Sequence, residues 1–174
     1  MKKGLLLLFL AALLSLGLYS QPVGSAEPDL MEMTVREVVV DPTSGAPLVV
    51  LQDSDKKKFV PIVIGINEAQ AISMEMNKVT PVRPMTHDLI KSIIEKLQAR
   101  LVRVVINDVR DNIIYALLYL RQDKGEVVID SRPSDSIALA LRVKAPIFVT
   151  KKVRDALAVE APAPEKREPK GFSL

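Results

Sequence analysis

The sequence has no cysteine, no tryptophan and a single histidine, His87, among its 174 residues. Without cysteine, disulfide bonds, thiolate metal clusters and a cysteine nucleophile are all excluded. One histidine cannot build a multi-histidine metal centre, so carboxylates would have to supply the protein ligands of any bound metal. Gly-rich phosphate loops, G-x-S-x-G and H-E-x-x-H are also absent, which leaves no established catalytic signature.

Aromatic residues are scarce, at 4% of the chain. Phe59, Tyr115, Tyr119 and Phe148 lie in apolar segments, where we expect them to belong to the core. Platforms on which bases of single-stranded nucleic acid would stack are therefore not evident. Hydrophobic residues make up 48% and charged residues 26%, which is enough apolar material for one folded domain.

The first 26 residues read as a secretory signal peptide. Lys2 and Lys3 precede an uncharged apolar run, Leu5–Tyr19, and small residues follow at Gly24–Ala26. The alternative is an uncleaved membrane anchor, although the run is short of the roughly 20 residues that a span requires. We therefore expect an exported protein, periplasmic or extracellular, with no membrane span after cleavage. Cleavage leaves 22 basic and 21 acidic residues, so the net charge falls from +3 to +1.

The folded domain is predicted to span residues 27–157, and the tail at 158–174, rich in proline and charge, is predicted to be disordered. Hydrophobic patterns predict an α+β fold with antiparallel or mixed sheets and helices packed on them. Three strands and then a helix occur in each half, which favours an internal duplication. The predicted strands are 31–40, 48–52, 59–64, 101–109, 112–121, 126–130 and 146–150, and the predicted helices 68–78 (N-cap Asn67), 87–99 (N-cap Thr86), 134–144 and 151–157.

A first polar cluster stands at the start of the second predicted helix: Arg83, Thr86, His87 and Asp88. A helix start attracts anions, and His87 is suited to general acid or base catalysis near neutral pH. In the structural alternative, Thr86 and Asp88 only cap the helix and His87 is partly buried on its apolar side.

A second cluster contains Asp130, Arg132, Ser134, Asp135 and Arg142. Carboxylates between a strand end and a helix start can hold Mg²⁺ or Mn²⁺, an arrangement used for metal-assisted phosphodiester cleavage. In the structural alternative, Asp135 caps the helix and Asp130 forms an ion pair with an arginine.

Three sequence blocks resemble the bifunctional nuclease (BFN) domain family over about residues 31–157. Pro61–Gly65 is followed by Glu68–Ile72, and Arg83–Leu89 comes next in the chain. Ile129–Arg142, followed by Ala145–Ile147, is the most specific block. The sequence departs from the family pattern where Leu97-Gln98 replaces the usual Leu-Gly, and in carrying a leader.

The resemblance implies an α+β domain, often a homo-oligomer, that cleaves both RNA and DNA. We therefore expect, from this resemblance, a nuclease of low specificity whose partners are nucleic acid and a second copy of the chain. Its catalytic candidates are His87, Asp88, Asp130 and Asp135; its substrate-binding candidates are Arg83, Arg132, Ser134 and Arg142; and its ligands for a divalent cation, Mg²⁺ or Mn²⁺, are Glu68, Asp130 and Asp135.

A second hypothesis gives the same residues no catalytic role. The chain would then be an exported binding or oligomerisation module in which these side chains cap helices and pair ions. Its subunit interface would be the apolar segment Ile113–Leu120.

Overall fold

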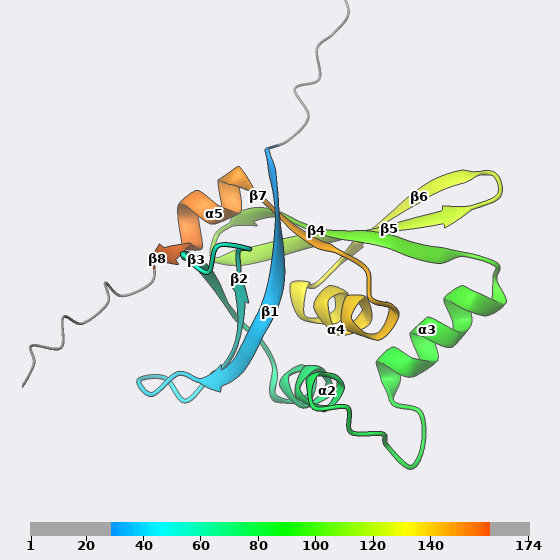
Figure 1. Ribbon diagram of the computed structural model, residues 1–174, viewed down its shortest axis with the longest axis horizontal. Coiled ribbons are helices and arrows are strands. Elements are labelled where there is room, and N and C mark those ends of the chain that lie inside the picture. Colours follow the sequence, from blue (N-terminus) through cyan, green and yellow to red (C-terminus); the bar gives the residue numbers. More distant parts are fainter. Residues whose placement is uncertain (1–28, 161–174) are drawn as a thin grey trace, which may run out of the picture.

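The computed structural model describes residues 29–160 (Figure 1). The predicted signal peptide and residues 161–174 of the predicted tail lie outside the described residues. The first residues of that tail are described, and Val159 and Glu160 form a short strand that pairs with Phe59 and Lys58. Within residues 29–160, no helix is both long and apolar enough to cross a membrane.

Eight strands and four helices make up residues 29–160, and they confirm the α+β class. Most predicted elements differ from the observed ones by one or two residues at either end. The strands are β1 (Leu30–Val40), β2 (Pro47–Gln52), β3 (Lys58–Val63), β4 (Arg100–Arg110), β5 (Ile113–Gln122), β6 (Gly125–Ser131), β7 (Ile147–Thr150) and β8 (Val159–Glu160), and the helices are α2 (Ile66–Met76), α3 (Thr86–Lys96), α4 (Pro133–Val143) and α5 (Lys151–Leu157).

The strands form one mixed sheet in the order β6-β5-β4-β7-β1-β2-β3-β8. Only β4 and β7 pair in parallel; every other neighbouring pair is antiparallel. Two three-stranded meanders, β1–β3 and β4–β6, are thus joined through β7. Each meander is followed by a helix, as the sequence pattern indicates, while the duplication itself stays a prediction.

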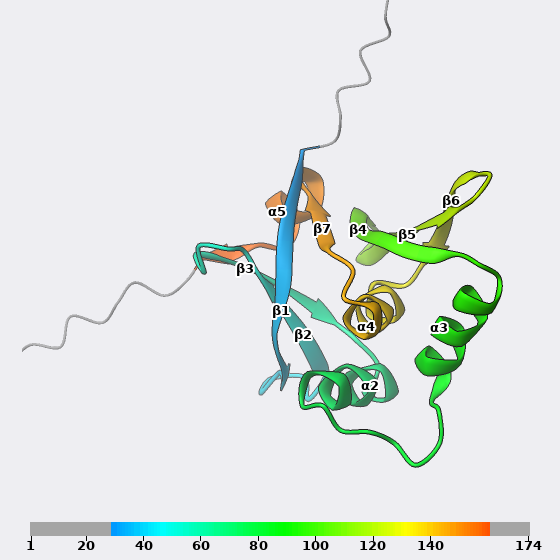
Figure 2. The same ribbon diagram turned by 45° about the vertical axis from the view of Figure 1, so that its right-hand side comes forward.

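Helix α4 lies at the centre of the molecule and contacts both α2 and α3 (Figures 1 and 2). Its residues Ile137–Ala140 are fully buried and pack against β4 and β5. Small alanine side chains at Ala138 and Ala140 let the neighbouring helices approach closely. Because α4 contacts both α2 and α3, it fixes where the starts of these helices lie.

Two helices begin slightly earlier than their predicted caps. The N-cap of α2 is Gly65, not Asn67, because the Gly65 carbonyl already accepts the first helical hydrogen bond, from Ala69. The N-cap of α3 is Met85, not Thr86. Helix α3 ends before Gln98, which takes the left-handed φ of 56° that glycine adopts more readily.

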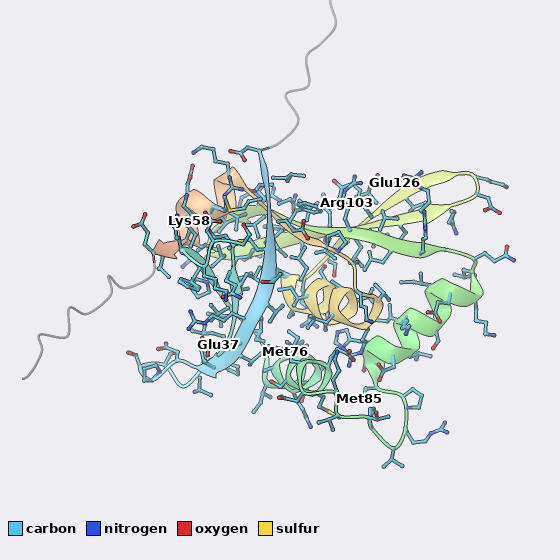
Figure 3. All side chains as sticks on the ribbon, in the orientation of Figure 1. Glu37, Lys58, Met76, Met85, Arg103 and Glu126 are labelled. Carbon is cyan, nitrogen blue, oxygen red and sulfur yellow. The ribbon has the colours of Figure 1, made fainter. Side chains whose placement is uncertain are left out.

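The prediction that all four aromatic side chains belong to the core is wrong for three of them. Phe59 is buried, but Tyr115, Tyr119 and Phe148 are only half-buried. The guanidinium of Arg103 lies 3.9 Å from the ring centre of Tyr119. Figure 3 shows Arg103 near Glu126 on the β4–β6 part of the sheet, far from Met85 at the start of α3.

Candidate functional site

The starts of α2, α3 and α4 meet at one cleft of about 310 Å³. Helix α2 contributes Glu68, α3 contributes His87, and α4 contributes Asp135 together with its N-cap residue Arg132. These four residues are far apart in the sequence and meet because α4 packs between the other two helices. The cleft is lined by Asn67, Glu68, Gln70, Ala71, Met85, Thr86, His87, Arg132 and Asp135.

Arg132 holds two carboxylates at the edge of this cleft. Its Nε donates to Asp135 Oδ2 at 2.6 Å, and its Nη2 donates to Asp135 Oδ1 at 3.0 Å and to Glu68 Oε1 at 2.8 Å. The hydrogen bonds that it donates to Asp135 and to Glu68 raise the pKa of Arg132 above its ordinary value, so the guanidinium stays charged. With 66% of its side chain exposed, Arg132 can still reach a ligand in solvent.

His87 lies deeper in the cleft and is only 5% exposed. Its Nε2 lies 3.1 Å from Asp135 Oδ1, within hydrogen-bond distance. A carboxylate bonded to one ring nitrogen orients the imidazole. The pair therefore has the geometry of a general base or acid held in place by an aspartate.

Asp135 is ionised at neutral pH. Partial burial alone would raise its pKa, but the hydrogen bonds from Arg132 and His87 outweigh that effect and lower the pKa below the ordinary 3.8. The Asp135 carboxylate thus carries a full negative charge next to His87 over the whole physiological range.

A second ion pair, between Asp88 and Arg142, lies behind the cleft and joins all three helices. Arg142 Nε donates to Asp88 Oδ1 at 2.6 Å, and Arg142 Nη1 donates to the carbonyl oxygens of Ala138 and Ala71. The Arg142 side chain is 5% exposed, so it is surrounded by protein. Asp88 Oδ2 accepts the Met85 N–H at 2.9 Å, which caps the helix that carries His87.

Gly65 stands where β3 turns into α2. A Cβ at this position would lie 2.2 Å from Glu68 Oε2. A side chain at this position would therefore displace the end of Glu68, whose other oxygen accepts from Arg132.

The structure brings together only part of the predicted site. Glu68, His87, Arg132 and Asp135 share the cleft, whereas Arg83 is an exposed loop residue that does not line it. Asp130 also lies elsewhere. It pairs with Leu117 of β5, between positions opposite the core residues Ala116 and Leu118, so it projects from the other face of the sheet.

Several cleft residues carry no sequence signal of function. Asn67 was expected only as a helix cap, and Gln70 is an ordinary residue one turn into α2. A surface glutamine on an amphipathic helix does not stand out, because its role depends on which helix packs opposite.

The described residues do not fit a divalent cation as they are arranged. Among residues 29–160, no group of three or more histidine, aspartate or glutamate side chains is placed to hold a metal ion. Two of the three predicted ligands, Glu68 and Asp135, already neutralise Arg132, and the third, Asp130, lies across the sheet.

The protein is therefore an α+β domain with a His–Asp–Arg cleft between three helix starts. Comparison with known proteins identifies the family to which it belongs. Residues 49–162 match the family described as the Bifunctional nuclease domain. The chain belongs to this family, which confirms the resemblance drawn from the three sequence blocks.

Relatives are found in bacteria and in plants. Uncharacterized proteins from two strains of Mycobacterium tuberculosis are 38% identical over 122 residues, which cover 70% of this chain and 73% of theirs. Bifunctional nuclease 2 of Arabidopsis thaliana is 34% identical over 98 residues, covering 53% of this chain and 29% of the plant protein.

The buried ion pair predicts a large effect on stability. Replacing Arg142 in Arg142→Met leaves Asp88 and the helix carbonyls without their donor, so the free energy of unfolding should fall by about 3 kcal/mol. Chemical denaturation measures this. The control is Arg36→Met, which breaks an exposed pair with Glu37 and should cost under about 1 kcal/mol. Equal losses in the two variants would contradict the role given to Arg142.

The lowered pKa values of Asp88 and Asp135 predict sensitivity to acid. Because the unfolded chain takes up protons at higher pH than the folded chain, stability should fall as the pH drops below the ordinary aspartate pKa of 3.8. In Asp135→Asn this decline should be shallower, as measured by urea unfolding between pH 5 and pH 2. Asp130→Asn, at an exposed position on β6, should keep the wild-type slope; a wild-type slope in Asp135→Asn would refute the assignment.

Proposed function

We propose that this protein is a nuclease that hydrolyses phosphodiester bonds of RNA and DNA with low sequence specificity. Membership of the bifunctional nuclease family supports a nuclease-like function, and the plant relative carries that name. The observation that carries the proposal is the His87–Asp135 pair, which shares a cleft with an exposed arginine.

In the proposed reaction, His87 acts on the attacking water. As a bond forms between the water oxygen and phosphorus, His87 takes the water proton, and the ester P–O bond breaks. The leaving oxygen then takes a proton from solvent or from the protonated histidine. Asp135 keeps the ring oriented and stabilises its positive charge.

Arg132 would bind the phosphate and offset the charge that builds up on it. Its Nε and Nη2 are bonded to carboxylates, but Nη1 is not part of those bonds. A guanidinium suits phosphate because its planar donors match the phosphate oxygens. Ser134, the neighbouring residue, is a second candidate for this contact.

A divalent cation stays a prediction from the sequence. Since the described residues do not fit one, the reaction above contains no step through a metal. Arg83 and Asp88 remain substrate-binding and catalytic candidates on sequence grounds, although Asp88 is held by Arg142 and by the Met85 N–H.

An exported binding or oligomerisation module remains the second candidate function. One observation favours self-association: β6 ends the sheet, and its residues Val127, Val128 and Ile129 are each more than 40% exposed. The predicted interface at Ile113–Leu120 belongs to β5, whose backbone already pairs with β4 and β6. We therefore place the homo-oligomer contact at β6. Export, or membrane anchoring by residues 1–26, stays a prediction.

The catalytic proposal predicts a selective loss of activity. The chain without residues 1–26 should degrade single-stranded RNA and plasmid DNA, and His87→Ala should lower kcat about 100-fold or more. Circular dichroism and melting temperature show whether the variant is folded. Asp130→Ala is the matched control and should keep wild-type activity, because Asp130 faces away from the cleft.

Treatment with EDTA tests whether the reaction needs a divalent cation. Activity that stops in EDTA and returns with Mg²⁺ or Mn²⁺ would support the cation prediction, and activity that persists would contradict it. Full activity in His87→Ala would refute the role of the histidine, and inactivity of the wild-type protein with every cation would favour the binding module.

A further inference from the structure

A second cleft, of about 490 Å³, lies on the other side of Arg132. Its walls are the end of β3, the turn between β4 and β5, and the start of α4, and nothing in the proposed reaction uses it. Pro61, Ile113, Ile114 and Leu157 make most of its surface apolar. Its volume lies within the roughly 300–1,000 Å³ range of small-molecule sites in proteins.

One end of this second cleft carries several hydrogen-bond donors. Ser134 lines it and is 6% exposed, yet its hydroxyl has no hydrogen-bond partner among the described residues. The first turn of α4 has no side-chain cap there, so the N–H groups of Ser134 and Asp135 are available. Arg132 adds the Nη1 group that its carboxylate partners do not use.

The other end of the cleft suits a flat, apolar group with a polar edge. Ile113 is 56% exposed and Val63 is 67% exposed, so both present apolar surface to solvent. Asn112 lies in the turn with a left-handed φ of 61°, and it lines the cleft together with these apolar residues. An amide both donates and accepts hydrogen bonds, and can therefore meet the polar edge of any nucleobase.

We propose that the second cleft binds one nucleotide unit, with its phosphate at Arg132 and Ser134 and its base against Ile113 and Pro61. The proposal rests on the proposed nuclease function and names the part of the substrate that this cleft holds. Because Arg132 lines both clefts, the bound phosphate lies next to the His87–Asp135 pair. Apolar walls contact the face of a base rather than its edge, which agrees with low sequence specificity.

Calorimetric titration with adenosine 5′-monophosphate and with inorganic phosphate tests this inference without any turnover. The wild-type protein should bind the nucleotide at least about tenfold more tightly than phosphate, because only the nucleotide buries apolar surface. Ser134→Ala should weaken both ligands about tenfold, because it removes a hydrogen bond to a charged group.

Ile113→Ser should weaken the nucleotide alone, by about threefold to tenfold, and leave phosphate binding unchanged. The matched control is Val40→Ser, since Val40 is 64% exposed and does not line the cleft. It should bind both ligands like the wild type. Melting temperatures confirm that each variant is folded.

Equal affinity for nucleotide and phosphate, or unchanged binding in Ser134→Ala, would overturn the inference. So would an Ile113→Ser variant that loses self-association while keeping nucleotide binding, because a second copy of the chain would then cover the cleft. A protein that binds the nucleotide but cleaves no nucleic acid would refute the proposed function and leave this inference standing.

Discussion

One buried guanidinium holds the functional part of this molecule together. Arg142 reaches from α4 to the carboxylate that caps α3 and to a carbonyl of α2, and its side chain is almost fully buried. A charge in that position is stable only while every partner is present. The relative placement of the three helix starts, and therefore of His87 and Asp135, depends on this contact.

Arg132, unlike the buried Arg142, lies at the surface. It pairs with both Glu68 and Asp135, which weakens the repulsion between these two carboxylates, and it lines both clefts. The net charge of residues 27–174 is +1, so binding of nucleic acid would depend on such local cations rather than on general attraction. In the proposed function, one exposed arginine thus connects the proton-transfer site with the surface that binds a base.

Much of the fold could be predicted from sequence because period-two and 3.6-residue patterns report burial directly. The predicted strand 112–121, for example, differs from β5 by one residue at each end. The candidate site was only partly predictable. Sequence separation cannot show that Glu68 meets Asp135, or that strand alternation turns Asp130 to the opposite face. The apolar cleft was missed because exposed isoleucine and valine residues resemble ordinary surface or core positions until the strands are placed.

The central claim is that Arg132 serves both clefts, and a single variant tests it most directly. In Arg132→Gln, nucleotide affinity and kcat/KM for RNA cleavage are measured on the same preparation, together with the melting temperature. The account predicts that both functional quantities fall at least tenfold, while the melting temperature changes by only a few degrees because this side chain is 66% exposed. Retention of either quantity at the wild-type value would contradict the account.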